Sequence, residues 1–266
     1  MAASAGSWPP EGRAMTTPPT TPRRPTAPRR RRLRRYIPPQ HGAWAMLLLP
    51  WLAGVLTTGF TWPHLPLLGA WLAGYLFSYY LLQAVKTRRP GRVRAQLCLY
   101  AAPTALLAAP VLALRPQLLW YAPAYATLLA INLGYAARRN ERALLNDLAS
   151  VAQSCLMVFV CATTSTAPPA EALPAFLVVT GYLAGTVPYV KTMIRERGHT
   201  GYYRASVAYH LAILAAAAWW HQPIAILFAL LLARATVFPK RPMAPKQVGI
   251  IEIAASLLLL LILAVT

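Results

Sequence analysis

The sequence GTVPYVKTMIRERGHTGYYRASVAYH, residues Gly185 to His210, places basic and polar side chains between two apolar runs. The first run extends from Phe176 to Val190, and the second begins at Val207. Apolar runs separated by a short polar joint are typical of successive helices that cross a membrane. Ionisable groups are costly beside hydrocarbon, so a cluster of them at a membrane face is a candidate functional site.

The composition indicates the same class of protein. Of the 266 residues, 57% are hydrophobic and 12% are charged, whereas charged residues make up about a quarter of a typical soluble protein. The net charge of +20 would suggest a nucleic-acid partner in a soluble protein. Here the charge is confined to the N-terminal segment and to alternate joints, which favours membrane orientation and affinity for anionic lipid. We therefore expect membrane lipid, and no nucleic acid, as a partner.

The chain divides after residue 37. Residues 1–37 are rich in Pro, Thr, Ala and Arg and cannot bury enough apolar surface to fold, so we expect a disordered cytoplasmic arm. Either Met1 or Met15 is compatible with the start of translation. Residues 38–266 are predicted to form an all-α transmembrane domain of about nine helices. The predicted spans are 43–60, 65–85, 95–114, 118–137, 144–163, 172–190, 205–220, 223–238 and 248–265.

The joints between these spans alternate in charge. The second, fourth, sixth and eighth joints carry several Lys and Arg residues each, whereas the intervening joints carry only Arg115. Basic residues accumulate in cytoplasmic loops. This alternation predicts that the N-terminus lies in the cytoplasm and that the C-terminus lies outside.

The opening stretch supplies the main candidate site. Lys191 and Arg195 are four residues apart and would share one face of a helix that continues through the joint. Tyr203, Ser206 and His210 follow the spacing of one face of the next helix. Two such faces can line a pocket for an anion such as a phosphate or a diphosphate. The alternative is that these residues anchor lipid head groups and set the orientation of the chain.

Further polar groups are predicted at the same membrane face. They are His41 at the start of the first span, and Asn146 and Asp147 at the start of the fifth. Asp147, the only aspartate, either favours the positive end of its helix dipole or takes part in a site. If the protein is an enzyme, His210, Tyr203 and Asp147 are the acid or base candidates. No Cys or His spacing typical of a metal site is present, so we expect neither a metal nor a cofactor.

A separate pair of charges lies inside the last two spans. Arg234 and Glu252 stand at similar depths in helices that would form an antiparallel hairpin. A lone buried carboxylate either takes up a proton or finds a cation. We expect a structural ion pair between these two residues.

Several segments resemble the YwiC-like family of bacterial membrane proteins. They are QHGAWAMLLLPWLAG, ERALLNDLA, YVKTMIRERG, YRASVAYH and PKQVGIIE, and together they cover nearly the whole chain after residue 37. This resemblance implies a multi-pass protein of the bacterial cytoplasmic membrane, without implying an activity.

The arrangement is also distantly similar to the UbiA-type prenyltransferases. Those enzymes have about nine helices and bind a prenyl diphosphate through Mg²⁺ on two aspartate-rich motifs after helices two and six. At those joints this chain has LQAVKTRRPGR and VKTMIRERG, with basic residues in place of the acids. The resemblance therefore implies a related fold without the Mg²⁺ site. Lys191, Arg195 and the basic residues of the second joint would bind a phosphate directly.

Three functions remain open from the sequence. The protein can bind an anionic or isoprenoid lipid, including a phospholipid, at a cytoplasmic-side cavity without catalysis. It can be a degenerate prenyltransferase-like enzyme acting on such a lipid. It can also be a transporter or a membrane assembly factor.

Overall fold

The computed structural model of the protein describes residue 36 and residues 41–265, without the side chains of residues 41–43. The predicted arm at residues 1–37 lies almost entirely outside this part, and the predicted boundary after residue 37 lies outside it too. The described residues form ten α-helices and three short 3₁₀ helices, with no strand. The α-helices are α2 (His41–Thr58), α3 (His64–Thr87), α4 (Arg94–Leu114), α5 (Ala122–Ala137), α6 (Leu144–Cys155), α7 (Met157–Ser165), α8 (Pro169–Ile194), α9 (Thr200–Trp220), α10 (Gln222–Val237) and α11 (Pro245–Val265). The 3₁₀ helices are η1 (Pro90–Arg92), η2 (Pro116–Tyr121) and η3 (Phe238–Lys240).

The all-α prediction is confirmed, and each predicted span corresponds to helical structure. The span predicted from residue 118 begins as the 3₁₀ helix η2, and α5 starts at Ala122, where Pro123 suits the first helical turn because it needs no amide partner. The span at 144–163 is interrupted at Leu156, which divides it into α6 and α7. With α6 and α7 taken as one span, six helical segments of the described chain are long and apolar enough to cross a membrane.

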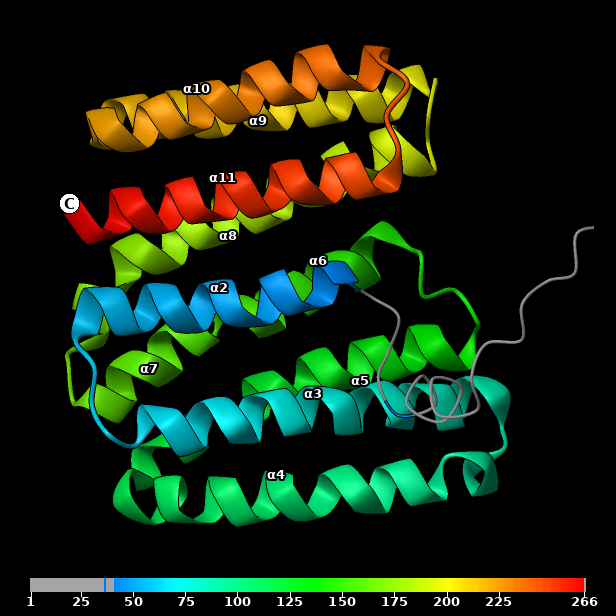
Figure 1. The fold of residues 1–266 in the computed structure, drawn as a ribbon, viewed down its shortest axis with the longest axis vertical. Helices are drawn as coiled ribbons and strands as arrows, with labels where there is room; N and C mark the ends of the chain where they lie inside the picture. Colours follow the sequence, from blue (N-terminus) through cyan, green and yellow to red (C-terminus); the bar gives the residue numbers. More distant parts are fainter. Residues whose placement is uncertain (1–35, 37–40, 266) are drawn as a thin grey trace, which may run out of the picture. The chain divides into compact units, whose positions relative to one another are not determined.

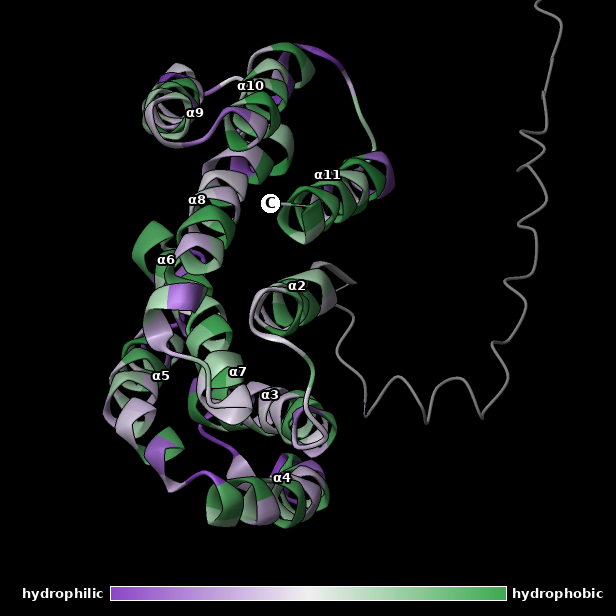
Figure 2. Cartoon of the chain, turned by 90° about the vertical axis from the view of Figure 1, so that its left-hand side faces the viewer, coloured by the Kyte–Doolittle hydropathy of each residue, from purple (hydrophilic) through white to green (hydrophobic). Residues whose placement is uncertain are grey.

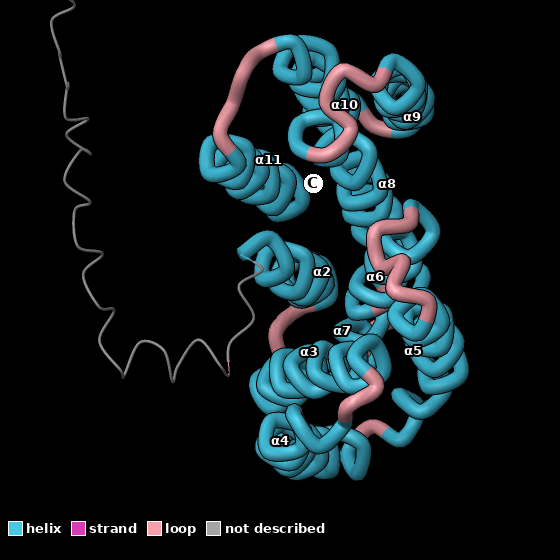
Figure 3. Tube along the Cα trace, turned by 90° about the vertical axis from the view of Figure 1, so that its right-hand side faces the viewer, coloured by secondary structure: helices cyan, strands magenta, loops and turns pink. Residues whose placement is uncertain are grey.

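With α6 and α7 counted as one span, successive helices run in alternating directions through the bundle (Figure 1). The joints α3–α4, α5–α6, α8–α9 and α10–α11 therefore lie at one common end, which faces the viewer in Figure 3. These joints carry most of the Lys and Arg residues that the structure describes. Figure 2 shows the resulting contrast between the largely hydrophobic α11 and the hydrophilic segment that joins it to α10. We call this end of the bundle the basic end.

Helices α2 and α8 form the centre of the packing. Helix α8 contacts α2, α6, α7, α9 and α11, and α2 contacts α7 and α11 in addition. The main apolar core includes Ala53 of α2, Val158 of α7, Val179 of α8 and Leu227 of α10, which are all fully buried. Helices are stabilised mainly by close packing of their side chains against neighbouring helices, and this core provides that packing.

Small residues permit the closest helix contacts. A Cβ atom added at Gly54 of α2 would lie 2.7 Å from the Cβ atom of Cys161 in α7. A Cβ atom added at Gly185 of α8 would lie 2.8 Å from Cε1 of Tyr209 in α9. Helices in membranes use glycine in this way because dispersion contacts between their backbones drive association.

Candidate functional site

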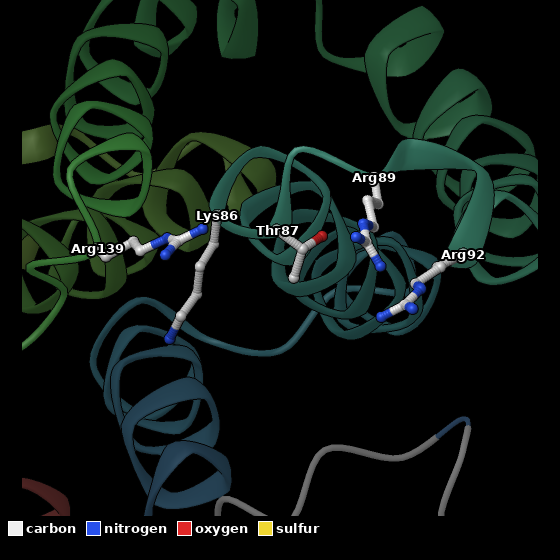
Figure 4. A pocket seen from close by; sticks show the side chains of 5 residues that line it. All are labelled: Lys86, Thr87, Arg89, Arg92 and Arg139. Carbon is white, nitrogen blue, oxygen red and sulfur yellow. The ribbon is translucent and has the colours of Figure 1, made fainter.

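A basic pocket lies at the basic end, between the end of α3 and the joint after α5. It has a volume of about 350 Å³ and is lined by Lys86, Thr87, Arg89, Arg92 and Arg139. Figure 4 shows Arg139 extending from the α5–α6 joint towards the residues at the end of α3. Four of the five lining residues are cationic and none is acidic, so the pocket favours an anion.

Two left-handed backbone turns shape this pocket. Arg88 ends α3 with a φ of 54°, and its amide donates to the carbonyl of Val85. Arg139 follows α5 with a φ of 57°, and its amide donates to the carbonyl of Ala136. Residues other than glycine adopt this conformation uncommonly. Both helices therefore end in tight turns, and residues of the two joints that follow line the same pocket.

One cation of the pocket already has a carboxylate partner. Lys86 Nζ lies 2.8 Å from Oε1 of Glu141, and both side chains are about one third exposed, at 40% and 31%. Partial burial opposes ionisation of Glu141, but the hydrogen bonds from Lys86 and from the backbone, together with the charges of Lys86 and Arg142, outweigh it and lower the pKa of this carboxyl group. The arginines of the pocket are therefore its main cations available to an external anion. Their planar guanidinium groups match the oxygens of a phosphate.

Lys191 has a different role from the anion ligand that its position suggested. Its Nζ lies 2.9 Å from Oδ2 of Asp147 and donates to the carbonyl of Arg142 at 2.6 Å. The Lys191 side chain is 8% exposed, so this contact is a nearly buried link between α8 and the start of α6. Asp147 lies in the first turn of α6, as one of its two predicted roles required, and also neutralises Lys191.

Arg195 and Lys191 do not form one cationic surface. Helix α8 ends at Ile194, and Arg195 is the exposed residue that follows it, whereas Lys191 is buried inside the helix. The predicted continuation of the helix through the joint is therefore wrong, because Gly198 and its neighbours form turns before α9 starts at Thr200. The Arg195 amide still donates to the carbonyl of Lys191, one turn earlier, so the two residues differ in burial and not in their place on the helix.

Tyr203, Ser206 and His210 lie on one face of α9, and this face packs against protein. The Tyr203 hydroxyl donates to the carbonyl of Thr236 in α10, and His210 Nδ1 lies 2.7 Å from the carbonyl oxygen of Ser206. The Ser206 hydroxyl is buried and has no hydrogen-bond partner among the described residues. Tyr203 thus contacts α10, and His210 faces α8, where its Nε2 atom would lie 3.2 Å from a Cβ atom added at Gly185. Lys191 contacts α6 instead, so the structure does not bring the two predicted faces together around one ligand.

Of two other predicted residues, the structure describes the side chain of Asn146 but not that of His41. Asn146 donates to the carbonyl of Glu141 at 2.8 Å and so helps to hold the joint beside the basic pocket. The side chain of His41 lies outside the described residues.

Arg234 and Glu252 form an ion pair between α10 and α11. Glu252 Oε2 also accepts hydrogen bonds from the hydroxyls of Thr186 at 3.1 Å and Tyr182 at 3.2 Å, both in α8. The Arg234 guanidinium lies 4.1 Å from the centre of the Tyr189 ring. Three helices are thus joined by one buried polar network, whose structural value remains a prediction.

Comparison with known proteins places the chain among its relatives. A family model described as YwiC-like protein matches residues 37–162. A Bacillus subtilis protein described as uncharacterized protein YwiC is 34% identical over 223 residues, which cover 83% of this chain and 93% of that protein. The chain belongs to the YwiC-like family.

A second relative of this YwiC-like chain is an uncharacterized protein of Haemophilus influenzae. It is 30% identical over 233 residues, covering 85% of this chain and 96% of the relative. No solved structure matches the chain. The topological likeness to UbiA-type enzymes therefore stays a prediction.

The basic pocket was only partly visible in the sequence of this YwiC-like chain. The basic residues of the second joint were expected to contribute to phosphate binding, but Arg139 comes from the fourth joint, more than forty residues away along the chain. The sequence feature that pointed to Arg139 was the excess of Lys and Arg in alternate joints. This excess indicates on which side of the membrane a joint lies, but it does not indicate which joints are neighbours.

Proposed function

We propose that this protein is a multi-pass protein of the bacterial cytoplasmic membrane that binds the phosphate group of an anionic amphiphile in the basic pocket. The observation that carries the proposal is the lining of the pocket by Lys86, Arg89, Arg92 and Arg139, with no acidic residue. The lining residues lie at the end of α3 or in the joints after α3 and α5, at the basic end. A phosphate held there would sit at the level of lipid head groups, with its apolar chain beside the helices.

Binding without catalysis fits the arrangement better than an enzymatic reaction. The acid and base candidates His210, Tyr203 and Asp147 do not line the basic pocket. Asp147 is already paired with Lys191. A phosphate in the pocket would meet cations and one threonine hydroxyl, which bind and orient an anion without transferring a proton at neutral pH.

The orientation is part of the same proposal. We place the basic end in the cytoplasm, because the lysines and arginines of the joints gather there. Single cysteines introduced at exposed positions of the α8–α9 joint should then react in intact cells only with a membrane-permeant maleimide. Labelling of these cysteines by an impermeant maleimide from outside would reverse the orientation.

Matched arginine variants test the pocket. Arg92→Gln with Arg139→Gln removes two lining cations, whereas Arg94→Gln with Arg138→Gln removes two exposed cations from the same joints that do not line it. Binding of geranylgeranyl phosphate by the purified protein in lipid nanodiscs should weaken roughly 10- to 30-fold in the first variant. This estimate takes about 1 kcal/mol for each exposed charge-assisted hydrogen bond. The second variant should bind within about twofold of the original protein.

Two further arms of this experiment separate the possible ligands. Inorganic phosphate should compete only weakly, because it lacks the apolar chain. Added salt should weaken the binding, because the contacts are exposed charges. Equal losses in the two arginine variants would show that total charge, and not the pocket, attracts the lipid, and would refute the proposal.

A further inference from the structure

An apolar groove runs between α10 and α11, away from the basic pocket. It has a volume of about 380 Å³. Its lining is aliphatic or aromatic at every position except one, and that exception is Arg234. The aliphatic part is formed by residues such as Leu227, Leu231, Ala254 and Leu258. A groove of this kind suits a hydrocarbon chain, and the position of the single cation marks where a polar head group would lie.

Arg234 has hydrogen-bonding capacity that the described protein does not use. Its Nη1 donates to Glu252, but Nε and Nη2 are buried and have no partner among the described residues. The hydroxyl of Tyr189, whose ring lies against the guanidinium, is also buried and without a partner. An unsatisfied buried donor costs about 1–3 kcal/mol, so these groups require an acceptor from elsewhere.

The geometry of arginine limits which chemical groups can serve as the acceptor. Nε–H and Nη2–H form one edge of the planar guanidinium and point in nearly the same direction, so both can donate to a single oxygen. Arg234 is 5% exposed, and its Nε and Nη2 atoms are themselves buried. One oxygen at the end of a hydrocarbon chain would satisfy both donors.

The charge of the site limits the acceptor further, to an uncharged group. Glu252 already neutralises Arg234, so the pair has no net charge. A second anion would bring an uncompensated charge into an apolar surrounding, which is strongly unfavourable. A hydroxyl or carbonyl oxygen accepts the two hydrogen bonds without adding charge.

We propose that the α10–α11 groove is a second lipid site, which binds an amphiphile with a neutral oxygen-bearing head group, an alcohol or a carbonyl, on Arg234 and an extended apolar chain along the groove. This site does not depend on the basic pocket. It is formed by a different pair of helices and favours a neutral head group, whereas the basic pocket favours an anionic one.

A matched series of C20 compounds tests the head group. Phytol, phytanic acid and phytane share one branched carbon skeleton, which carries a single double bond in phytol, and they end in an alcohol, a carboxylic acid and a hydrocarbon. A diazirine-bearing phytol should label the purified protein on α10 or α11 in nanodiscs, and unlabelled phytol should suppress the labelling. Phytane should compete about tenfold less well, because it cannot accept the two hydrogen bonds. Phytanic acid, ionised at neutral pH, should also compete less well than phytol.

Variants of the groove provide the second arm. Ala254→Phe fills the groove from an exposed position, and Ala233→Phe does so from the opposite helix. Either change should reduce the labelling at least fivefold. Ile253→Phe adds the same ring at an exposed neighbouring position that does not line the groove, and should leave the labelling unchanged.

Several results would overturn the second site. Equal competition by phytane would mean that the groove holds any bilayer chain. Preference for phytanic acid, absence of labelling by the phytol probe, or full labelling of both filled variants would each contradict the proposal as well. Arg92→Gln with Arg139→Gln should leave phytol labelling unaltered, so the two proposed sites can fail separately.

Discussion

Replacing Arg234 with methionine tests how much the buried polar network contributes to folding. In the original protein Glu252 Oε1 pairs with Arg234, while Oε2 accepts hydrogen bonds from Tyr182 and Thr186. The variant keeps the length of the side chain and removes the cation. Glu252 is then left as a carboxylate, 14% exposed, with two hydroxyl donors and no positive partner.

The expected loss of stability is large. Removing one partner of a buried ion pair typically costs about 3–5 kcal/mol, because the remaining charge is uncompensated. Removing both charges, with Arg234→Met and Glu252→Gln together, should cost less than the methionine change alone. In this double variant the single carbonyl oxygen of the glutamine can accept from both Tyr182 and Thr186, and no buried charge is left. For a chain of this size, 3–5 kcal/mol corresponds to a fall of about 6–20 °C in Tm.

The cysteines of the protein provide the assay. Cys155 and Cys161 are buried and Cys98 is exposed, so in a Cys98→Ser background a thiol-reactive dye reports unfolding. Thermal denaturation in detergent would be followed for the original protein, both single variants and the double variant. The reasoning is refuted if Arg234→Met lowers Tm by less than about 2 °C, or if the double variant loses as much as the two single variants combined.

Three further predictions concern the helix contacts and the basic end. Gly185→Ala should lower the stability by about 1–3 kcal/mol in the same thermal assay, because the added methyl would lie 2.8 Å from a tyrosine ring, whereas Gly249→Ala, which meets nothing within 4 Å, should be neutral or stabilising. Lys191→Met should lower Tm by several degrees, because it leaves the aspartate partner unpaired; an unchanged Tm would show that the link between α8 and α6 contributes nothing. Because the pKa of Glu141 in the folded protein is lowered, its pair with Lys86 should stabilise the fold above roughly pH 4.3 and lose this effect as the pH falls through the lowered pKa. Lys86→Met should therefore flatten the acid side of a plot of Tm against pH, and an unaltered acid side would contradict this assignment.

Local features of the sequence determined the helices and their order. The apolar runs predicted every span, since a segment of about 20 apolar residues buries its backbone polar groups only by forming a helix. Helix ends were less well determined. α5 starts at Ala122 and not at the predicted residue 118, and the break at Leu156 inside the span 144–163 was not predicted, because proline positions and local packing set these limits.

The contact between Arg234 and Glu252 was also accessible from the sequence. Two opposite charges at similar depths in consecutive apolar helices have few other partners, and the connecting joint brings the helices together as an antiparallel hairpin. The acceptor groups of this network on α8 were not accessible. Tyr182 and Thr186 lie some seventy residues before Glu252 and resemble ordinary helix residues when the sequence is taken alone.

The partners of the remaining charges were decided by the tertiary structure. Lys191 looked like a free cation next to Arg195, but the packing of α8 against α6 gives it Asp147. Arg139 belongs to another joint than Arg92, yet both line one pocket. Hydrophobic patterns and charge bias are local properties of the sequence. They therefore specify which segments are helices and which helix ends lie on the same side of the membrane. Which side chains meet depends on the lateral order of the helices, and this order is set by close packing between segments that are distant in the sequence.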